Sequence, residues 1–229
     1  KWNVTIVSDS TSPTISNIQI NETTVYNDKN VKINATVTDN IAVQIVYIAE
    51  NSTSSWVNQS TTQSGSEYYY VVPETNLANQ ENVSYYVIAN DSANNLVQST
   101  IRSFFVVNRA PNNVTLISPL NASSTTNRTQ KFNWTSATDE DADSISYLLQ
   151  VDEQSNADKE NPIAPDFASP DINTTTSAAP LNSPTQLKAD TVYYWRVRVN
   201  DSYNYSSWSS VFQVTIDSLI SITLGQNNI

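Results

Sequence analysis

The chain has 229 residues, with 11 Lys and Arg against 22 Asp and Glu, a net charge of −11, and no His, Cys or Met. A chain this acidic is a poor partner for nucleic acid and for anionic membranes, which attract basic surfaces. The absence of His and Cys excludes zinc, copper, haem and iron–sulfur sites of the usual kind, and with them Ser-His-Asp and Cys-His catalysis. No apolar run approaches the roughly 20 residues of a membrane span, so this segment is not expected to insert into a membrane.

Apolar and polar residues alternate along four segments, which in chain order are 31–37, 83–89, 145–151 and 193–199. A period of two is typical of β-strands with one buried face. The chain has only 2 Gly, so its turns are expected at Asn, Asp, Ser and Pro, the polar ones bonding their own backbone. Together these features predict an all-β chain of antiparallel β-sandwiches.

The chain contains an internal repeat. Residues 77–92 align without gaps on residues 187–202, and an aromatic-rich segment closes each copy, SFFVVNRAP at 103–111 and VFQVTIDS at 211–218. Two modules are therefore predicted, at about 12–108 and 109–217, and their linkers carry Pro13 and Pro111, where Pro marks the start of a first strand.

The ends of the sequence resemble parts of further modules. Trp2–Val7 reads like FQVTID at 212–217, so residues 1–11 are expected to be the last strand of a preceding module or an inter-subunit strand. Residues 218–229 are expected in the same way to be the first strand of a following module or an inter-subunit strand. The partners of these strands would be neighbouring modules of a longer array, which we favour, or identical subunits that exchange strands.

The segment LKADTVYYWRVRV at 187–199 resembles the penultimate strand of fibronectin type III modules. By this resemblance Tyr193 is the corner tyrosine and Trp134 the buried tryptophan of the second strand, whereas Ala189-Asp190 replaces the usual Pro-Gly. The positions that carry the resemblance are Leu187, Thr191, Tyr193, Trp195, Val197 and Val199.

The first module, with VTDNIAVQIVYI at 37–48 and YYVIANDSANN at 85–95, looks like the Ig-like domains of archaeal and bacterial surface proteins. The two resemblances imply tandem Ig/fibronectin III-like antiparallel sandwiches with flanking strands at both termini, in an S-layer, stalk or filament protein. They imply an extracellular or cell-surface location and no enzymatic activity. Such sandwiches host many roles, so the resemblances specify the fold more closely than the function.

Asn-x-Ser/Thr acceptors for N-linked glycans number fourteen, about twice the number expected by chance from the composition. An Asn- and Thr-rich chain forms such triplets freely, but those in predicted strands fall on outward positions, where attachment is possible. Covalent N-glycans are therefore expected on a secreted protein. The acceptors are Asn3, Asn21, Asn34, Asn51, Asn58, Asn82, Asn90, Asn113, Asn121, Asn127, Asn133, Asn173, Asn200 and Asn204.

The loop DEDAD places Asp139, Asp141 and Asp143 at alternate positions, near the turn that holds Asp201 in a sandwich of this type. Alternating carboxylates favour a structural Ca²⁺ site, although the EF-hand pattern is not met, and a solvated acidic turn is the alternative. No other cofactor is expected. The first module has only Asp39 and Asp91 in corresponding places, which predicts a weaker site.

Two groups of aromatic residues suggest surface roles. Arg196 and Arg198 are expected to point outward beside Trp208 and to form a cation–π ladder that seals the last two strands. Trp56 and the segment SEYYYVVP at 66–73 are an alternative aromatic platform. Its partner would be carbohydrate or a host or cell surface. In that segment Tyr69 is predicted to fill the core, while Tyr68 and Tyr70 cover the opposite face.

Paired carboxylates such as Asp152 and Glu153 could suggest glycosidase chemistry, but a small sandwich lacks the groove that holds two acids across a substrate. The stretch that follows them, to about residue 175, is predicted to be a long loop. The function expected from the sequence is structural: a stiff, heavily N-glycosylated, rod-like part of a cell-surface stalk, S-layer or filament. The alternative is an adhesion or carbohydrate-binding module of a secreted protein.

Overall fold

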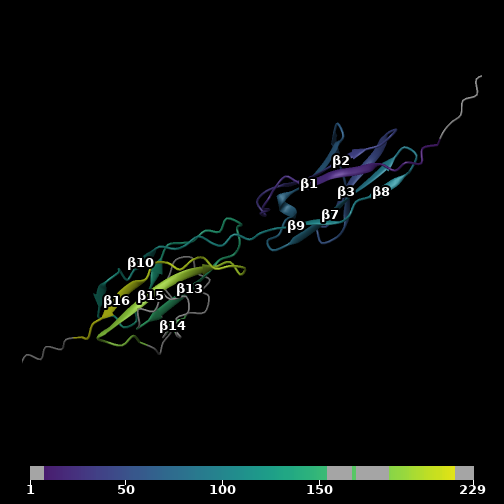
Figure 1. The fold of residues 1–229 in the computed structure, drawn as a ribbon. Coiled ribbons are helices and arrows are strands. Elements are labelled where there is room, and N and C mark those ends of the chain that lie inside the picture. The colour runs from purple at the N-terminus through teal and green to yellow at the C-terminus, as the bar shows by residue number, and fades with distance from the viewer. Residues whose placement is uncertain (1–7, 154–166, 169–185, 220–229) are drawn as a thin grey trace, which may run out of the picture. The chain divides into compact units, whose positions relative to one another are not determined.

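The computed structural model describes residues 8–153, 167–168 and 186–219 (Figure 1). The chain divides into two compact units, unit 1 at residues 1–108 and unit 2 at residues 109–229. The described part is made of strands and a single short 3₁₀ helix, η1 (Glu74–Asn76), so the prediction of an all-β chain built from antiparallel sheets is confirmed.

Unit 1 is a sandwich of two antiparallel sheets. One sheet has the strand order β1-β2-β6-β5, and the other has the order β4-β3-β7-β8, with β9 also paired to β7. The strands of the first sheet are β1 (Thr14–Ile20), β2 (Val31–Thr38), β5 (Thr62–Ser64) and β6 (Glu67–Val72). Those of the second are β3 (Val43–Glu50), β4 (Val57–Ser60), β7 (Asn82–Asp91), β8 (Leu96–Gln98) and β9 (Arg102–Phe105).

The core of unit 1 follows directly from the alternation in the sequence. Every second residue of β2 and β7 is buried, so one face of each strand points into the space between the sheets. Ile33 and Ala35 on β2 and Val83 and Val87 on β7 have no exposed surface at all. The alternating segments 31–37 and 83–89 are thus confirmed as strands with one core face.

Unit 2 contains a larger five-stranded sheet of order β11-β16-β15-β13-β14 and a short pair, β10-β12. All pairings are antiparallel except β11 with β16, which run parallel. The strands are β10 (Leu116–Ser118), β11 (Ser123–Thr125), β12 (Asn133–Trp134), β13 (Ser146–Asp152), β14 (Phe167–Ala168), β15 (Thr191–Asn200) and β16 (Phe212–Ile216).

The aromatic residues that the fibronectin III resemblance singled out lie at the centre of unit 2. Trp134 on β12 and Trp195 on β15 are 1% and 0% exposed. Tyr193 is also buried, and its hydroxyl accepts a hydrogen bond of 2.9 Å from the backbone N–H of Lys188, five residues upstream. A buried tyrosine that bonds the backbone just before its own strand is the arrangement of a tyrosine corner. The roles predicted for Tyr193 and Trp134 are confirmed.

The phase predicted for the tyrosines of β6 is wrong. Tyr68 is 7% exposed and belongs to the core of unit 1, Tyr70 packs against that core, and Tyr69 points the other way, with Lys32 Nζ 4.3 Å from its ring centre. The pairing of β6 with β2 explains this, because Tyr70 lies opposite Ile33 and Tyr68 opposite Ala35. Residues directly opposite each other on paired strands share a face of the sheet.

Equivalent turns in the two units are built by Asp91 and Asp201 without glycine. Asp91 Oδ1 accepts two backbone N–H groups at 2.8 Å, and Asp201 Oδ1 accepts two at 2.7 and 2.5 Å. Burial raises the pKa of Asp91, but hydrogen bonds from the side chain and backbone of Asn95 and from other N–H groups of the turn outweigh it, so the pKa lies below its usual value. The stabilisation by this carboxylate is present above its unfolded pKa and is lost as the pH falls through the lower folded value.

Three predictions concern residues that are described only in part. The terminal strands predicted at 1–11 and 218–229 lie mostly outside the described residues, and the described residues 8–11 and 218–219 are in no strand. Within the loop predicted after Glu153, Phe167–Ala168 is described and pairs with Gln150–Val151 as β14. The rest of that loop lies outside the described residues.

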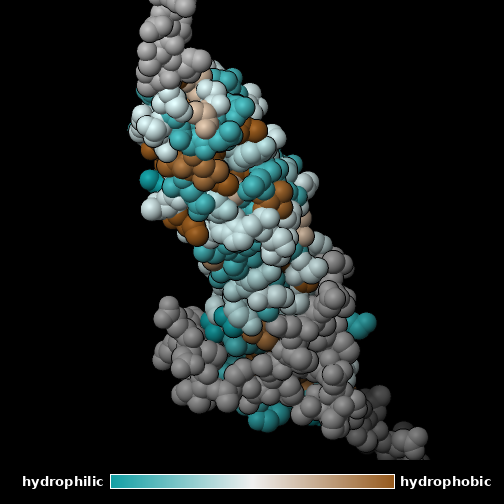
Figure 2. Space-filling view, turned by 90° about the vertical axis from the view of Figure 1, so that its right-hand side faces the viewer, coloured by the Kyte–Doolittle hydropathy of each residue, from teal (hydrophilic) through white to brown (hydrophobic). Residues whose placement is uncertain are grey.

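Several large apolar side chains are exposed, among them Ile41 and Leu96, each 64% exposed. On the face of unit 1 that Figure 2 shows, brown apolar groups alternate with hydrophilic surface. Scattered apolar residues of this kind are normal for a folded protein. No helix in the described part of the chain is long and apolar enough to cross a membrane.

Candidate functional site

The acidic loop of unit 2 brings three of its carboxylates together. Asp139, Asp141 and Asp143 each offer an oxygen within 4.8 Å of the others. The loop takes this form because Asp139 Oδ1 accepts the backbone N–H groups of Asp141 and Asp143, at 2.9 and 3.3 Å. Asp201, predicted as a fourth ligand, is not among the carboxylates that come together here, and its Oδ1 holds its own turn instead. The calcium site predicted from these residues stays a prediction.

A cation of the protein itself lies at this cluster. The Arg109 guanidinium Nη1 is 2.6 Å from Asp141 Oδ1, and the Arg109 backbone N–H donates to Asp141 Oδ2, also at 2.6 Å. Glu140 Oε2 lies 3.4 Å from Arg109 Nε. The Asp141 side chain has no exposed surface, and the two contacts from Arg109 offset part of the cost of burying its charge. From the sequence, Arg109 was placed in the linker and was not expected to have this role.

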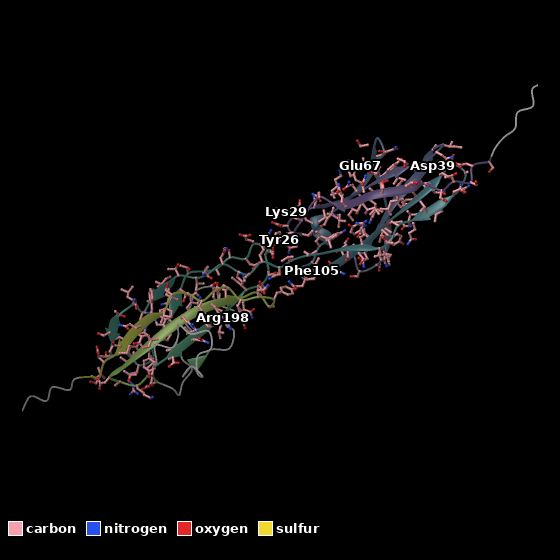
Figure 3. All side chains as sticks on the ribbon, in the orientation of Figure 1. Tyr26, Lys29, Asp39, Glu67, Phe105 and Arg198 are labelled. Carbon is pink, nitrogen blue, oxygen red and sulfur yellow. The ribbon has the colours of Figure 1, made fainter. Side chains whose placement is uncertain are left out.

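Unit 1 has a second acidic cluster, formed by Asp9, Asp39 and Asp91, whose oxygens also lie within 4.8 Å of one another. The sequence analysis singled out Asp39 and Asp91 but missed Asp9, which precedes β1. Asp39 follows β2 and Asp91 ends β7, so the cluster joins three segments distant in sequence. In Figure 3, Asp39 lies at the end of unit 1 remote from Tyr26 and Phe105.

The predicted cation–π ladder is confirmed. The guanidinium carbons of Arg196 and Arg198 lie 4.0 and 4.6 Å from the Trp208 ring centre, and that of Arg198 lies 3.7 Å from the ring of Tyr205. Arg196 is only 2% exposed, and its Nε donates a 3.0 Å hydrogen bond to Gln150 on the neighbouring strand. The ladder therefore covers the outer face of β15, with Arg196 buried beneath it and Tyr205, at 43% exposed, at its solvent side.

Serine hydroxyls close the edge of β15 beyond the end of its pairing with β16. Ser209 donates its N–H to Val197 O and accepts the Val197 N–H on its hydroxyl, at 2.8 and 3.0 Å. Ser206 makes the same pair of bonds with Val199. In unit 1, Ser99 makes the same pair with Val87. These bonds satisfy strand N–H groups that would otherwise form an open edge, which is a structural role.

Trp56, the centre of the predicted sugar platform, is 46% exposed. Its ring centre lies 4.8 Å from that of Tyr86, and the two ring planes are inclined by 53°. The pair is therefore an exposed aromatic group but not a flat surface of two coplanar rings.

Glu153 takes part in a structural contact. Its carboxylate lies 2.5 Å from Lys188 Nζ and accepts a hydrogen bond of 3.2 Å from the Tyr193 hydroxyl. The hydrogen bond from Lys188 lowers the pKa of Glu153, burial opposes it, and Tyr193 adds to the lowering, which leaves the pKa below its usual value. A general acid requires a raised pKa, so the lowered pKa does not suit Glu153 to that role, and its contacts with Lys188 and Tyr193 are structural.

Twelve of the fourteen glycan acceptors fall on described residues, and Asn3 and Asn173 do not. None of the twelve is buried. Five are half-buried: Asn34, Asn51, Asn90, Asn133 and Asn200. Seven are exposed: Asn21, Asn58, Asn82, Asn113, Asn121, Asn127 and Asn204.

Comparison with known proteins gives an immunoglobulin-like match for most of unit 2. Residues 114–217 match the family model of the Rha78A-like, N-terminal immunoglobulin domain. No curated protein sequence matches the chain.

Among solved structures, the chain is similar to the fibronectin(III)-like modules of Clostridium thermocellum CbhA, with 14% identity, a TM-score of 0.36, and coverage of 91% of this chain and 100% of that chain. It is similar to a two-domain fibronectin type III segment of chicken tenascin, with 10% identity, a TM-score of 0.41, and coverage of 90% and 99%. A tetra-tandem repeat in the extending region of a large adhesion protein matches with 16% identity, a TM-score of 0.44, and coverage of 91% and 50%.

Proposed function

We propose that the chain is a structural part of an extracellular glycoprotein, in which Ig/fibronectin III-like sandwiches in series form a stiff, rod-like section of a stalk, S-layer or filament. The side-chain networks that the structure describes close the sheets: the arginine ladder covers β15, and serine hydroxyls occupy strand edges. Such contacts stabilise a module without forming a site for substrate.

The observation that carries this proposal is the placement of the glycan acceptors. Not one of the described acceptors lies in either core, although they occur in strands, turns and linkers alike. The charged fraction of the chain is only 14%, so attached sugars would supply surface polarity that charged residues provide in most extracellular rods.

Glycopeptide mass spectrometry of the native protein is expected to find sugar on Asn113, which is exposed and begins the triplet Asn113-Val-Thr. Asn113→Gln should remove that glycan. Asn112→Gln is the matched control, because Asn112 is the exposed neighbour but begins no acceptor triplet, so the glycan on Asn113 should remain. Native peptides that carry unmodified asparagine at all exposed acceptors would contradict the glycoprotein proposal.

The second candidate, a carbohydrate-binding module, is favoured by the exposed Trp56–Tyr86 pair. Aromatic rings of this kind bind the apolar faces of sugars. The structural proposal expects no saturable binding on a glycan array. Saturable binding that Trp56→Ala abolishes and Tyr203→Ala preserves would establish the binding module instead, since Tyr203 is similarly exposed, at 51%, but belongs to unit 2.

A further inference from the structure

The acidic cluster of unit 1 has no cation of its own. Asp9, Asp39 and Asp91 form no ion pair with Lys or Arg in the described part of the chain. In unit 2, by contrast, the Arg109 guanidinium lies 2.6 Å from Asp141 Oδ1 of the acidic cluster. Asp9 precedes Asp39 by 30 residues (39 − 9), and Arg109 precedes Asp139 by the same 30 (139 − 109). The residue 30 positions before the loop aspartate is therefore an arginine in unit 2 and a third carboxylate in unit 1.

Two oxygens at the unit 1 cluster are buried and unpartnered. Asp39 Oδ1 accepts the N–H groups of Ile41 and Ala42, each at 3.0 Å, and Asp9 Oδ1 accepts the N–H of Thr11 at 3.0 Å. These bonds hold each carboxylate in a fixed orientation. Asp9 and Asp39 are half-buried, but the second oxygen of each, Oδ2, is shielded from solvent and has no hydrogen-bond partner. Asp139 Oδ2 in unit 2 is in the same state, but there Arg109 supplies a cation to the cluster. A buried carboxylate oxygen without a donor is costly unless a cation completes it.

We propose that unit 1 binds one Ca²⁺ ion between the carboxylates of Asp9, Asp39 and Asp91. Ca²⁺ prefers oxygen ligands at about 2.3–2.6 Å, so oxygens on opposite sides of the ion lie about 4.6–5.2 Å apart. The three carboxylates, each with an oxygen within 4.8 Å of the others, fit that span. Water and neighbouring oxygens complete the six to eight ligands that Ca²⁺ takes.

The ion would tie together three segments of unit 1. Asp9 lies in the segment that leads into β1, Asp39 in the loop after β2, and Asp91 at the end of β7. Asn40 and Asn95 already cross-link these segments, with Nδ2 of each 3.2 Å from an oxygen of Asp9. Bound Ca²⁺ would fasten the lead-in segment to the sandwich more firmly. This proposal concerns unit 1 alone and does not depend on glycosylation.

Isothermal titration of the chelator-treated, full 229-residue chain with CaCl₂ tests the proposal. One site is expected, with a Kd of about 10⁻⁴–10⁻³ M, the range of extracellular modules. Asp39→Asn and Asp9→Asn should each weaken binding by about tenfold or more. Asparagine keeps the Oδ1 acceptor, so both variants should fold, as circular dichroism can verify. Scanning calorimetry should show the transition of unit 1 rising by roughly 5–10 °C in excess Ca²⁺.

The matched control is Asp139→Asn, because Asp139 Oδ1 also holds its loop by accepting two backbone N–H groups. Its Ca²⁺ affinity should equal that of the unaltered chain. The proposal is overturned if the chain shows no saturable binding up to about 10 mM Ca²⁺, which is ten times the largest Kd expected of such modules. It is equally overturned if Asp139→Asn abolishes binding while Asp9→Asn and Asp39→Asn preserve it.

Discussion

Replacing Trp195 with alanine is expected to lower the free energy of unfolding of unit 2 by about 3–5 kcal/mol, the usual cost of removing a buried tryptophan. The Trp195 side chain is 0% exposed, and its ring lies against Phe132 and Phe212, with centre-to-centre distances of 5.1 and 5.8 Å. Alanine would leave a cavity at the centre of β15 that these neighbours cannot fill. Since domains of this size are stable by about 5–15 kcal/mol, unit 2 would become marginal.

Calorimetry combined with hydrogen exchange measures this effect separately in the two units. The unit 2 transition should fall by roughly 12 °C or more, and exchange should accelerate across β13 and β15. Unit 1 should keep its protection, because the two cores share no residue. Trp56→Ala is the control, as Trp56 is 46% exposed and its loss should cost about 1 kcal/mol or less. Equal destabilisation by the two substitutions would contradict this account of the core.

The positions of the core faces could be predicted from the sequence wherever polar residues alternate with apolar ones. In β2, the polar residues Lys32, Asn34 and Thr36 mark the outward phase, so the inward residues are determined without any knowledge of the partner strand. In β7 the outward phase is marked by Ser84 and Asn90 near the two ends of the strand. In such segments the hydrophobic effect alone selects the buried face.

The phase of β6 is only weakly marked in the sequence, because its one charged residue is Glu67 at the start of the strand and the run Tyr68–Val72 contains no polar residue. Either set of alternate residues could be buried as far as hydrophobicity is concerned. The choice depends on the register with β2, a long-range pairing, and the inward Ile33 places Tyr70 inward with it. In β6 the pairing with β2, and not the hydrophobic pattern, determines which face is buried.

The residues that approach the acidic loops could not be predicted from the sequence pattern either. The alternating aspartates of the DEDAD loop could be recognised as a cluster because local backbone bonds shape that loop. Asp9 and Arg109 reach the loops only after the chain has folded, from segments 30 residues upstream. Their opposite charges were visible in the sequence, but the tertiary approach that makes those charges matter was not.

Replacing Arg109 with alanine is therefore expected to destabilise unit 2 by about 3 kcal/mol, since removal of one partner from a buried pair leaves an uncompensated charge. The Asp141 side chain is completely buried, while Arg109 is 18% exposed, so the low end of the range for buried pairs applies. Arg109→Lys should retain most of the stability because it keeps a cation near Asp141. The double variant Arg109→Ala with Asp141→Asn should be less destabilised than the two single changes predict when added.

The same substitution should make unit 2 respond to Ca²⁺. Asp139, Asp141 and Asp143 have oxygens within 4.8 Å of one another in the unaltered chain, and the substitution removes the guanidinium that pairs with Asp141. Excess Ca²⁺ should then raise the unit 2 transition of Arg109→Ala, while the same transition of the unaltered chain moves much less. If the unaltered chain responds equally, an ion binds beside Arg109, as the sequence pattern at Asp139–Asp143 predicts, and the guanidinium does not take its place. If neither responds, the loop binds no calcium in either state, and Arg109 acts only as the counter-charge of Asp141.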